Sequence, residues 1–387
     1  MEEKKRFIVI GFSLILVSAF FDNIRGPVLP LFTSLYGLSH SQSSAFFWVA
    51  SVSAFLISIS SVRLLARWSE RAYIQFCLAI QAAAILFASA GGYAALLLSG
   101  AAWGAGNSGI GMSSNLVLLR GSTDKDRPRL MSALHLFYGI GSVLPASYVA
   151  ATADRWSPQG IVLPTLVLVV LLAVLSFQLP ASGEHAQPSM GMPWRDMFRP
   201  HPLACNLVIS AYVLGEVLNS MWLVTYLNSH AGLSVPEASR FQQLYFLSLA
   251  ASRVLGAFLL KPGMEDRLPV PLMLASAAGL GAGLAGWRQG FLLASFCFGP
   301  VFPLLGAKLA KDYPDQFSSL LSFTYAVMTV LLALGHVLVG LISDRFSLQA
   351  AFVLPSLCLL AAVLLTFVRD RLLPHAPQTP EVRPCTP

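Results

Sequence analysis

Two carboxylates, Asp22 and Glu216, lie inside long apolar runs of a chain that keeps nearly all its other charges at the ends of such runs. An ionised side chain at the centre of a bilayer costs at least about 2.5–3.5 kcal/mol, so such residues are usually paired and functional. A carboxylate in this setting can take up and release a proton. The two residues are therefore our candidates for proton-coupling groups.

Two arginines also lie within apolar runs. Arg25 follows Asp22 at spacing i,i+3, which places both side chains on one face of a helix. Arg253 is a natural partner for Glu216 or for an anionic ligand, because a guanidinium presents a fork that matches a carboxylate. Two structural alternatives stay open. The first is that Asp22 and Arg25 neutralise each other and only fix helix packing. The second is that Arg253 lies near the end of its helix and extends its charge to the membrane surface.

Further polar and aromatic side chains share helix faces with these charges. Tyr212 and Trp222 lie on or beside the stripe of Glu216, and His135 and His336 can relay protons near neutral pH. Structural hydrogen bonding is the alternative for each of them, and the glycines of residues 93–119 predict close helix packing. The residues that we expect to contact a substrate are Arg25, Asn107, His135, Tyr212, Asn219, Trp222, Gln242, Arg253, Tyr325 and His336.

The elements that must position these side chains are membrane-spanning helices. The 387 residues are 56% hydrophobic and only 11% charged, whereas a soluble domain carries about 25% charged residues. The mean hydropathy is +0.68. An apolar stretch of about 20 residues can span a bilayer as a helix. Twelve such stretches cover residues 7–35, 44–66, 72–91, 93–119, 129–152, 159–180, 201–229, 238–261, 268–287, 289–309, 317–342 and 347–368. The expected fold class is an all-α polytopic membrane protein.

The net charge of +7 comes from basic residues that lie mainly in the loops on one side of the predicted helices. With twelve spans, most Lys and Arg residues fall in the loops on the side of the N-terminus, and only Arg155, Arg240, Arg288 and Arg345 fall in the opposite loops. Cytoplasmic loops carry such an excess of basic residues. We therefore expect a multi-pass protein of the cell (inner) membrane with both termini cytoplasmic. The basic excess implies a lipid bilayer and no nucleic acid as partner.

An internal repeat is visible in the sequence. Residues 36–46, YGLSHSQSSAF, align with residues 231–241, AGLSVPEASRF, at an offset of 195. In both copies Gly-Leu-Ser is followed three residues later by Gln or Glu, which is the spacing of a capping box. Ser39 and Ser234 are therefore predicted to begin the second helix of each half.

A second match, at an offset of 190, aligns Asp154-Arg-Trp-Ser with Asp344-Arg-Phe-Ser at the end of the fifth helix of each half. Six helices followed by the same six again is the predicted organisation. The predicted divisions are an N-terminal six-helix bundle (1–180), a cytoplasmic linker rich in Pro, Gly and Ser (181–200), a C-terminal six-helix bundle (201–373) and a disordered cytoplasmic tail (374–387).

This 6+6 duplication with a central linker resembles the major facilitator superfamily. The basic motif of that superfamily between helices 2 and 3 is matched in Val62-Arg-Leu-Leu-Ala-Arg67-Trp-Ser-Glu-Arg71 by Arg67 and Arg71, but its Asp and both glycines are missing. The resemblance implies the superfamily fold of two pseudo-symmetric bundles, with the binding site between them.

Two stretches also resemble the fucose:proton symporter group and its sugar-transporting relatives. They are Leu134-His135-Leu-Phe-Tyr-Gly-Ile-Gly141 and Phe298-Gly-Pro-Val-Phe-Pro303, the latter followed by Gly340-Leu-Ile-Ser-Asp344. In that group an aspartate of the first helix couples protons, and Asp22 is its match here. The sequence departs from the group by adding Arg25.

The sequence contains no motif that is typical of an enzyme. There is no catalytic triad pattern, nucleotide motif or metal-ligand spacing, and the five cysteines show no disulfide framework. We therefore expect no enzyme activity, no cofactor and no metal site. The hypothesis is a monomeric secondary active transporter that couples protons to a small-molecule substrate, a sugar or a carboxylate. The alternatives are a drug or metabolite efflux antiporter and a non-transporting receptor or scaffold.

Overall fold

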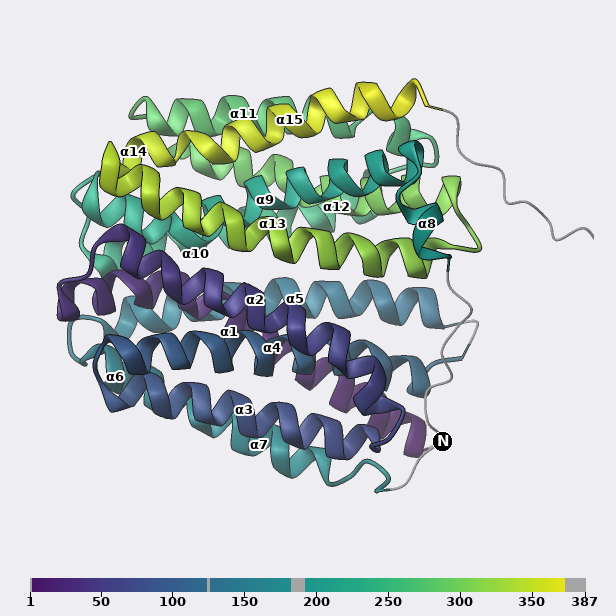
Figure 1. The fold of residues 1–387 in the computed structure, drawn as a ribbon, viewed down its shortest axis with the longest axis horizontal. Helices are drawn as coiled ribbons and strands as arrows, with labels where there is room; N and C mark the ends of the chain where they lie inside the picture. Colours follow the sequence, from purple (N-terminus) through teal and green to yellow (C-terminus); the bar gives the residue numbers. More distant parts are fainter. Residues whose placement is uncertain (1, 124–125, 182–191, 373–387) are drawn as a thin grey trace, which may run out of the picture.

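The computed structural model describes residues 2–123, 126–181 and 192–372, and all regular structure in these residues is helical (Figure 1). This confirms the all-α prediction. The first half of the chain contains α1 (Glu2–Tyr36), α2 (His40–Leu65), α3 (Glu70–Ala90), α4 (Tyr93–Gly121), α5 (Arg127–Thr152), α6 (Pro158–Val162), the 3-10 turn η1 (Leu163–Thr165) and α7 (Leu166–Ser176).

The second half repeats this series after the short helix α8 (Trp194–Met197), which lies within the predicted linker. It contains α9 (Pro200–Ser229), α10 (Val235–Leu259), the 3-10 turn η2 (Met264–Asp266), α11 (Pro269–Leu284), α12 (Gln289–Asp312), α13 (Phe317–Arg345), α14 (Leu348–Ala351) and α15 (Val353–Asp370).

Each of the twelve expected spans has a helical counterpart among the described residues, but length and apolarity alone support only nine of them as membrane-crossing. Helix α11 is apolar yet has only 16 residues. Helices α4 and α10 carry many small or polar residues and do not reach the hydropathy of the others. The sixth span is helix α6 continued through η1 into α7, with Pro164 at the junction.

Both predicted capping boxes are present. The hydroxyl of Ser234 accepts from the N–H of Glu237, and the Glu237 carboxylate accepts from the N–H of Ser234 at 2.8 Å. In the first half the hydroxyl of Ser39 accepts from the N–H of Gln42 at 3.2 Å, and the Gln42 amide oxygen accepts from the N–H of Ser39 at 2.9 Å. The second helix of each half therefore begins at the predicted residue.

The structure adds further pairs that follow the repeat. Gly91, between α3 and α4, and Gly286, between α11 and α12, lie 195 residues apart and have φ angles of +89° and +103°. Because side chains disfavour this backbone conformation, glycine permits the tight turn at both places. The short connection between residues 72–91 and 93–119 is thereby confirmed as a turn between two helices.

An ion pair is repeated in the same way. Glu70, at the start of α3, binds Arg120 at the end of α4, with 2.8 Å between Oε1 and Nε. Glu265 is the residue 195 positions further along, and its Oε1 lies 3.1 Å from Nζ of Lys311 near the end of α12. In the first half the pair joins α3 to α4, and in the second half it joins η2, the turn that precedes α11, to α12.

The two halves lie side by side, with α1–α7 in one group and α9–α15 in the other (Figure 1). We call the end at which α1 begins the basic end, and the opposite end, where α1 ends and α2 begins, the far end. Between the halves, α2 packs against α13, α5 against α10, and α1 against α9 and α10. All predicted site residues except Asn107 lie on these helices.

Close packing by the glycines of α4 is confirmed. A Cβ on Gly104 would overlap the carbonyl oxygen of Ala50 in α2. Glycine at this position lets two helix backbones approach directly, as expected for membrane bundles. Helix α4 therefore packs within the first half, and α1, α2 and α5 face the second half.

Candidate functional site

The first charged cluster joins α1 to α5. The Arg25 guanidinium contacts the Asp22 carboxylate, and its Nε donates to the backbone oxygen of Asp22 at 3.1 Å. The hydroxyl of Tyr138 in α5 donates to the other carboxylate oxygen of Asp22 at 2.7 Å. The i,i+3 pairing predicted from the sequence is therefore present, and a tyrosine completes it.

The second cluster joins α9 to α10. Arg253 Nη2 lies 3.5 Å from Oε1 of Glu216, and the hydroxyl of Tyr212, one turn before Glu216, hydrogen-bonds to the other carboxylate oxygen. The guanidinium of Arg253 thus points into the protein, towards the middle of α9. The alternative that Arg253 extends to the membrane surface is wrong for this structure.

The two clusters meet across the interface between the halves. Helix α5, which carries His135 and Tyr138, packs against α10, which carries Arg253, and a Cβ on Gly139 would lie 4.0 Å from the Cβ of Ala250. The clusters thus form a row from Arg25 and Asp22, through Tyr138, to Arg253 and Glu216. The side chains of Asp22 and Arg253 keep 31% and 26% of their surface accessible. Both side chains are therefore only partly enclosed by the protein.

Trp222 and His336 form a different layer. The indole N–H of Trp222 in α9 donates to Nδ1 of His336 in α13 at 3.0 Å, and both side chains are buried. The ring of Phe47 in α2 stacks on His336 with 4.7 Å between centroids and meets Trp222 edge-on at 5.6 Å. The Arg25 guanidinium lies 5.9 Å from the centre of the same Phe47 ring. These contacts pack the halves together beside the charged row.

The remaining predicted ligand residues are dispersed. Gln242 donates to the backbone oxygen of Ser220 at 2.7 Å and is buried between α10 and α9. Asn219 is fully buried next to Tyr245. Asn107 is buried in α4, and Tyr325 in α13 is 44% exposed. The structure does not join these last two to the charged row.

Tyr138 and Phe47 contact the predicted site residues but were not predicted from the sequence. Tyr138 lies one turn after His135 in the stretch that resembles the sugar symporters, so its shared helix face was a usable signal. Phe47 gave no such signal, because an aromatic residue in an apolar span is ordinarily packing. Its contacts with Trp222 and His336 depend on how α2 meets the second half.

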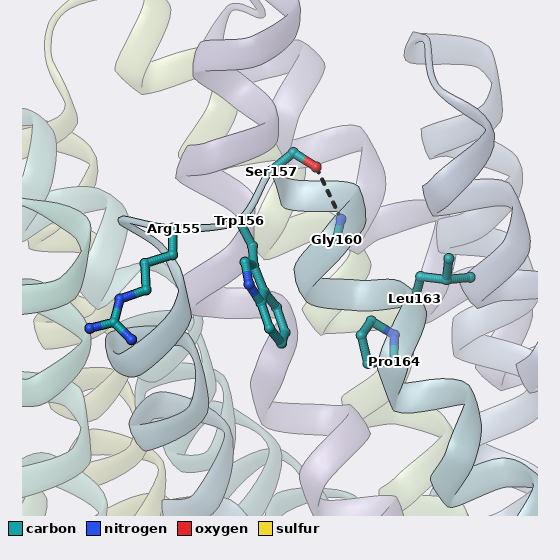
Figure 2. A pocket seen from close by; sticks show the side chains of 6 residues that line it. All are labelled: Arg155, Trp156, Ser157, Gly160, Leu163 and Pro164. Atoms are coloured by element: carbon teal, nitrogen blue, oxygen red, sulfur yellow. Dashed lines mark hydrogen bonds between the residues drawn. The ribbon is translucent and has the colours of Figure 1, made fainter.

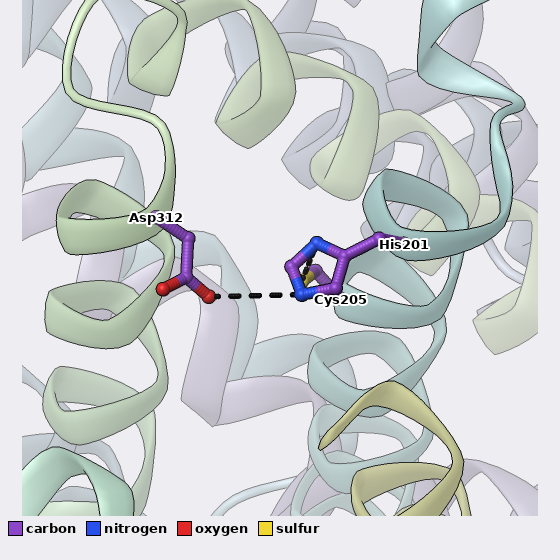
Figure 3. A group of neighbouring side chains, drawn as sticks. All are labelled: His201, Cys205 and Asp312. Atoms are coloured by element: carbon purple, nitrogen blue, oxygen red, sulfur yellow. Dashed lines mark hydrogen bonds and ion pairs between the residues drawn. The ribbon is translucent and has the colours of Figure 1, made fainter. Parts of the chain in front are cut away.

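A third polar group lies at the basic end of the second half, where the imidazole of His201 lies between Cys205 and Asp312 (Figure 3). Its Nδ1 faces the Tyr313 hydroxyl at 2.8 Å and the Cys205 sulfur at 3.7 Å, whereas Nε2 faces Asp312 at 3.9 Å. One metal ion cannot use both ring nitrogens. Lys308 also lies 3.0 Å from Asp312 and competes for its charge. We interpret this group as a hydrogen-bonded network between helices.

A surface groove lies at the far end, between the end of α5 and the start of the sixth span (Figure 2). Its lining residues are Arg155, Trp156, Ser157, Gly160, Leu163 and Pro164. The hydroxyl of Ser157 caps α6 by accepting from the N–H of Gly160 at 3.2 Å. None of the predicted site residues lines the groove, so it is separate from the charged row.

The fold and this row of residues can be compared with known proteins. The sequence matches the Major Facilitator Superfamily over residues 11–319, most of the chain. The chain belongs to this superfamily. Membership and the apolar helices make it a multi-pass membrane transporter rather than an enzyme, and the expected resemblance is confirmed. No curated protein matches the sequence.

Solved transporters of the superfamily share the fold. The xylose transporter XylE from E. coli, in an inward-open conformation, gives a TM-score of 0.77 at 11% identity, covering 93% of this chain and 95% of its own. A bacterial homologue of the human lysosomal transporter Spinster gives 0.73 at 15% identity, covering 95% and 97%. The E. coli fucose:proton symporter FucP gives 0.63 at 17% identity, covering 94% and 98%. At such identities the likeness concerns the fold.

Proposed function

We propose that this superfamily member is a secondary active transporter, a proton-coupled symporter of a small polar or anionic organic solute such as a sugar or a carboxylate. One observation carries the proposal. Each half contributes a carboxylate that is paired with an arginine and hydrogen-bonded to a tyrosine, and the two groups meet between the halves. Ionisable residues at such a depth are retained for ion and substrate pathways.

The balance of charges in the row supports coupling to protons. Two carboxylates face two guanidinium groups, so the row is neutral when all four are ionised. Protonation of one carboxylate leaves an arginine without its counter-ion. An unpaired arginine is unfavourable in a low-dielectric site, so protonation favours either new contacts for that arginine or the binding of an anionic ligand. Proton binding and solute binding are thereby linked through the same groups.

Alternating access is the proposed mechanism. Residues 1–180 would rock against residues 201–373 about the charged row, joined by the linker 181–200. Much of this linker, residues 182–191, and the tail 374–387 lie outside the described residues. The proposal fits a superfamily whose sites lie at the interface of structural repeats. Structures similar to this one include a D-xylose–proton symporter and the fucose:proton symporter.

The experiment begins with a thermal-shift screen of the purified protein against sugars, carboxylates and amphipathic cations, because a bound ligand stabilises the native state. A hit is then tested in proteoliposomes with an imposed proton gradient. We expect Glu216→Gln and Asp22→Asn to abolish gradient-driven accumulation while substrate exchange continues. An amide keeps the shape of the side chain but cannot release a proton.

Asp154→Asn is the control, since Asp154 is exposed at the far end and lies outside the charged row. It should accumulate substrate as the wild type does. If both amide variants in the row also concentrate substrate at the wild-type rate, coupling through these carboxylates is wrong. Accumulation of substrate on the opposite side of the membrane would instead support the efflux antiporter.

A further inference from the structure

The two arginines of the charged row differ in how fully their donors are used. Arg25 binds the carboxylate and the backbone oxygen of Asp22 and lies over Phe47. Arg253 has one contact, 3.5 Å long, with Glu216, and its buried Nε has no hydrogen-bond partner among the described residues. A guanidinium carries five N–H donors. Arg253 is therefore the cation with spare capacity for a ligand.

The hydrogen bonds of Tyr212 indicate what can release Arg253. The Tyr212 hydroxyl lies within hydrogen-bonding distance of both Glu216 Oε2 and the backbone oxygen of Phe298, the latter at 2.8 Å. A hydroxyl has one proton and cannot donate to both acceptors at once. When Glu216 is ionised, one acceptor loses its donor. When Glu216 is protonated, its own O–H can donate to Tyr212, and Tyr212 then donates to Phe298.

Asp22 lacks this second arrangement. Its carboxylate is held by the Arg25 guanidinium on one oxygen and by Tyr138 on the other. In both contacts the Asp22 oxygen accepts the hydrogen bond. Of the two acids, Glu216 is the one whose surroundings can satisfy the protonated state as well as the ionised one.

We propose that Arg253 is the receptor for a carboxylate group of the substrate, which becomes available when Glu216 takes up a proton. This inference rests on the proposed function and narrows it to an anionic substrate. The proton adds to Glu216 Oε2, Glu216 releases Arg253, and the substrate carboxylate pairs with the guanidinium. The row then holds the Arg25 and Arg253 cations, the Asp22 anion and one substrate anion, so it is neutral again. One proton is therefore bound for each substrate molecule.

The location of Arg253 suits this role. Arg253 lies one turn after Ala250 in α10, and a Cβ on Gly139 in α5 would lie 4.0 Å from the Ala250 Cβ. Helices α5 and α10 pack against each other across the interface. A carboxylate bound there is placed where rocking of the halves changes its surroundings, and bidentate pairing with arginine fixes its orientation.

The test uses short-chain monocarboxylates and the amides of the same acids as probes, with binding to purified protein followed by thermal shift and calorimetry. We expect at least one carboxylate to bind, with about one proton taken up per ligand. Its affinity should fall by up to about tenfold per pH unit as the proton becomes harder to bind. The matching amide should not bind.

Variants separate the residues. Arg253→Ala should abolish carboxylate binding, and Arg253→Lys should weaken it because the fork is lost. Glu216→Gln should bind the carboxylate without proton uptake and with no pH dependence. Asp154→Asn, at an exposed residue outside the row, is the control, and it should keep the proton uptake measured for the wild type. Circular dichroism and the melting temperature of each variant confirm that it is folded.

Several results would overturn the inference. They are binding of neutral sugars but of no carboxylate in the panel, carboxylate binding that is equally tight in Arg253→Ala, and proton uptake that is lost in Asp22→Asn but kept in Glu216→Gln. A neutral sugar that is still accumulated by a proton gradient would leave the proposed symporter in place and remove only this narrower assignment.

Discussion

Asp344, at the end of α13, accepts a hydrogen bond from the backbone N–H of His40, the first residue of α2, with 2.8 Å between Oδ1 and N. Its other carboxylate oxygen accepts from the N–H of Ser41 at 2.9 Å. A side chain of the second half thus caps a helix of the first half. Since the first N–H groups of a helix have no partner within it, this cap closes the far end of the interface.

Asp344→Asn should favour opening of the far end. An amide can accept only one of the two hydrogen bonds and carries no charge to oppose the helix dipole. Loss of a cap costs about 0.5–2 kcal/mol, and about 1 kcal/mol changes a population ratio about fivefold. Spin labels at exposed Leu35 and Trp287, one in each half at the far end, should report a larger population of long distances.

Asp154→Asn is the matched control for this variant, because Asp154 aligns with Asp344 in the repeat and follows directly after α5, whereas Asp344 lies in the last turn of α13. In the second half, the first turn of α10 has fewer free backbone N–H groups than the first turn of α2. Pro236 has no N–H, and the N–H of Glu237 is taken by Ser234. The distances in Asp154→Asn should match those of the wild type. A shift of similar size in both variants would mean that the cap does not hold the far end closed.

Ser41→Pro should reproduce the second-half arrangement in the first half. Proline is well tolerated in the first turn of a helix, so α2 should still begin at His40. The substitution removes the N–H that donates to Asp344 Oδ2 at 2.9 Å and leaves the His40 contact. The same spin-label pair should show a shift towards opening that is smaller than in Asp344→Asn. If the distances do not shift at all, the hydrogen bond from Ser41 does not contribute to closure, and only the one from His40 does.

Gly340 packs α13 against α2 one turn before Asp344. A Cβ at this position would overlap the Ser44 hydroxyl and lie 2.8 Å from the Cα of Ser41. Gly340→Ala should therefore prevent full closure of the far end and raise the open population in the spin-label measurement. Gly306→Ala, in a helix position with open space around the added Cβ, should not. Equal behaviour of the two would show that α13 can shift to accommodate the methyl group.

The sequence predicted the helices and the local contacts within them well. The capping boxes of Ser39 and Ser234 and the Asp22–Arg25 pair depend on residues three positions apart, and helix geometry alone brings such residues together. The repeat offset of 195 also relates Gly91 to Gly286 and Glu70 to Glu265, but these pairs were recognised only in the structure.

Contacts between distant helices could not be predicted. Tyr138 and Asp22 are 116 residues apart, and Asp344 and His40 are 304 apart. Such contacts follow from how the helices pack, and a single sequence carries no signal of that packing. For the same reason Trp222 and His336 were expected to bind substrate, whereas they hydrogen-bond to each other in a buried layer. Their role in substrate binding stays a prediction.

A charge network at the basic end predicts a pH-dependent stability. Hydrogen bonds from Lys311 at 2.7 Å and Lys308 lower the pKa of Asp266 in η2. A folded pKa below the unfolded one stabilises the native state above the unfolded pKa, and this contribution is lost as pH falls through the lowered pKa. Asp266→Asn should lower the melting temperature at neutral pH, and its difference from the wild type should vanish in acid. Asp315→Asn is an exposed control that should show neither effect.

The orientation of the chain is the last prediction. The excess of Lys and Arg at the basic end predicts that this end faces the cytoplasm. Four of the five cysteines are buried, so a background with Cys385 replaced by Ser should be silent to a membrane-impermeant maleimide. In intact cells a cysteine at exposed His230, at the far end, should be labelled, and a cysteine at exposed Ala181 should be labelled only after permeabilisation. The reverse labelling pattern would show that the orientation is opposite to the predicted one, with the far end facing the cytoplasm.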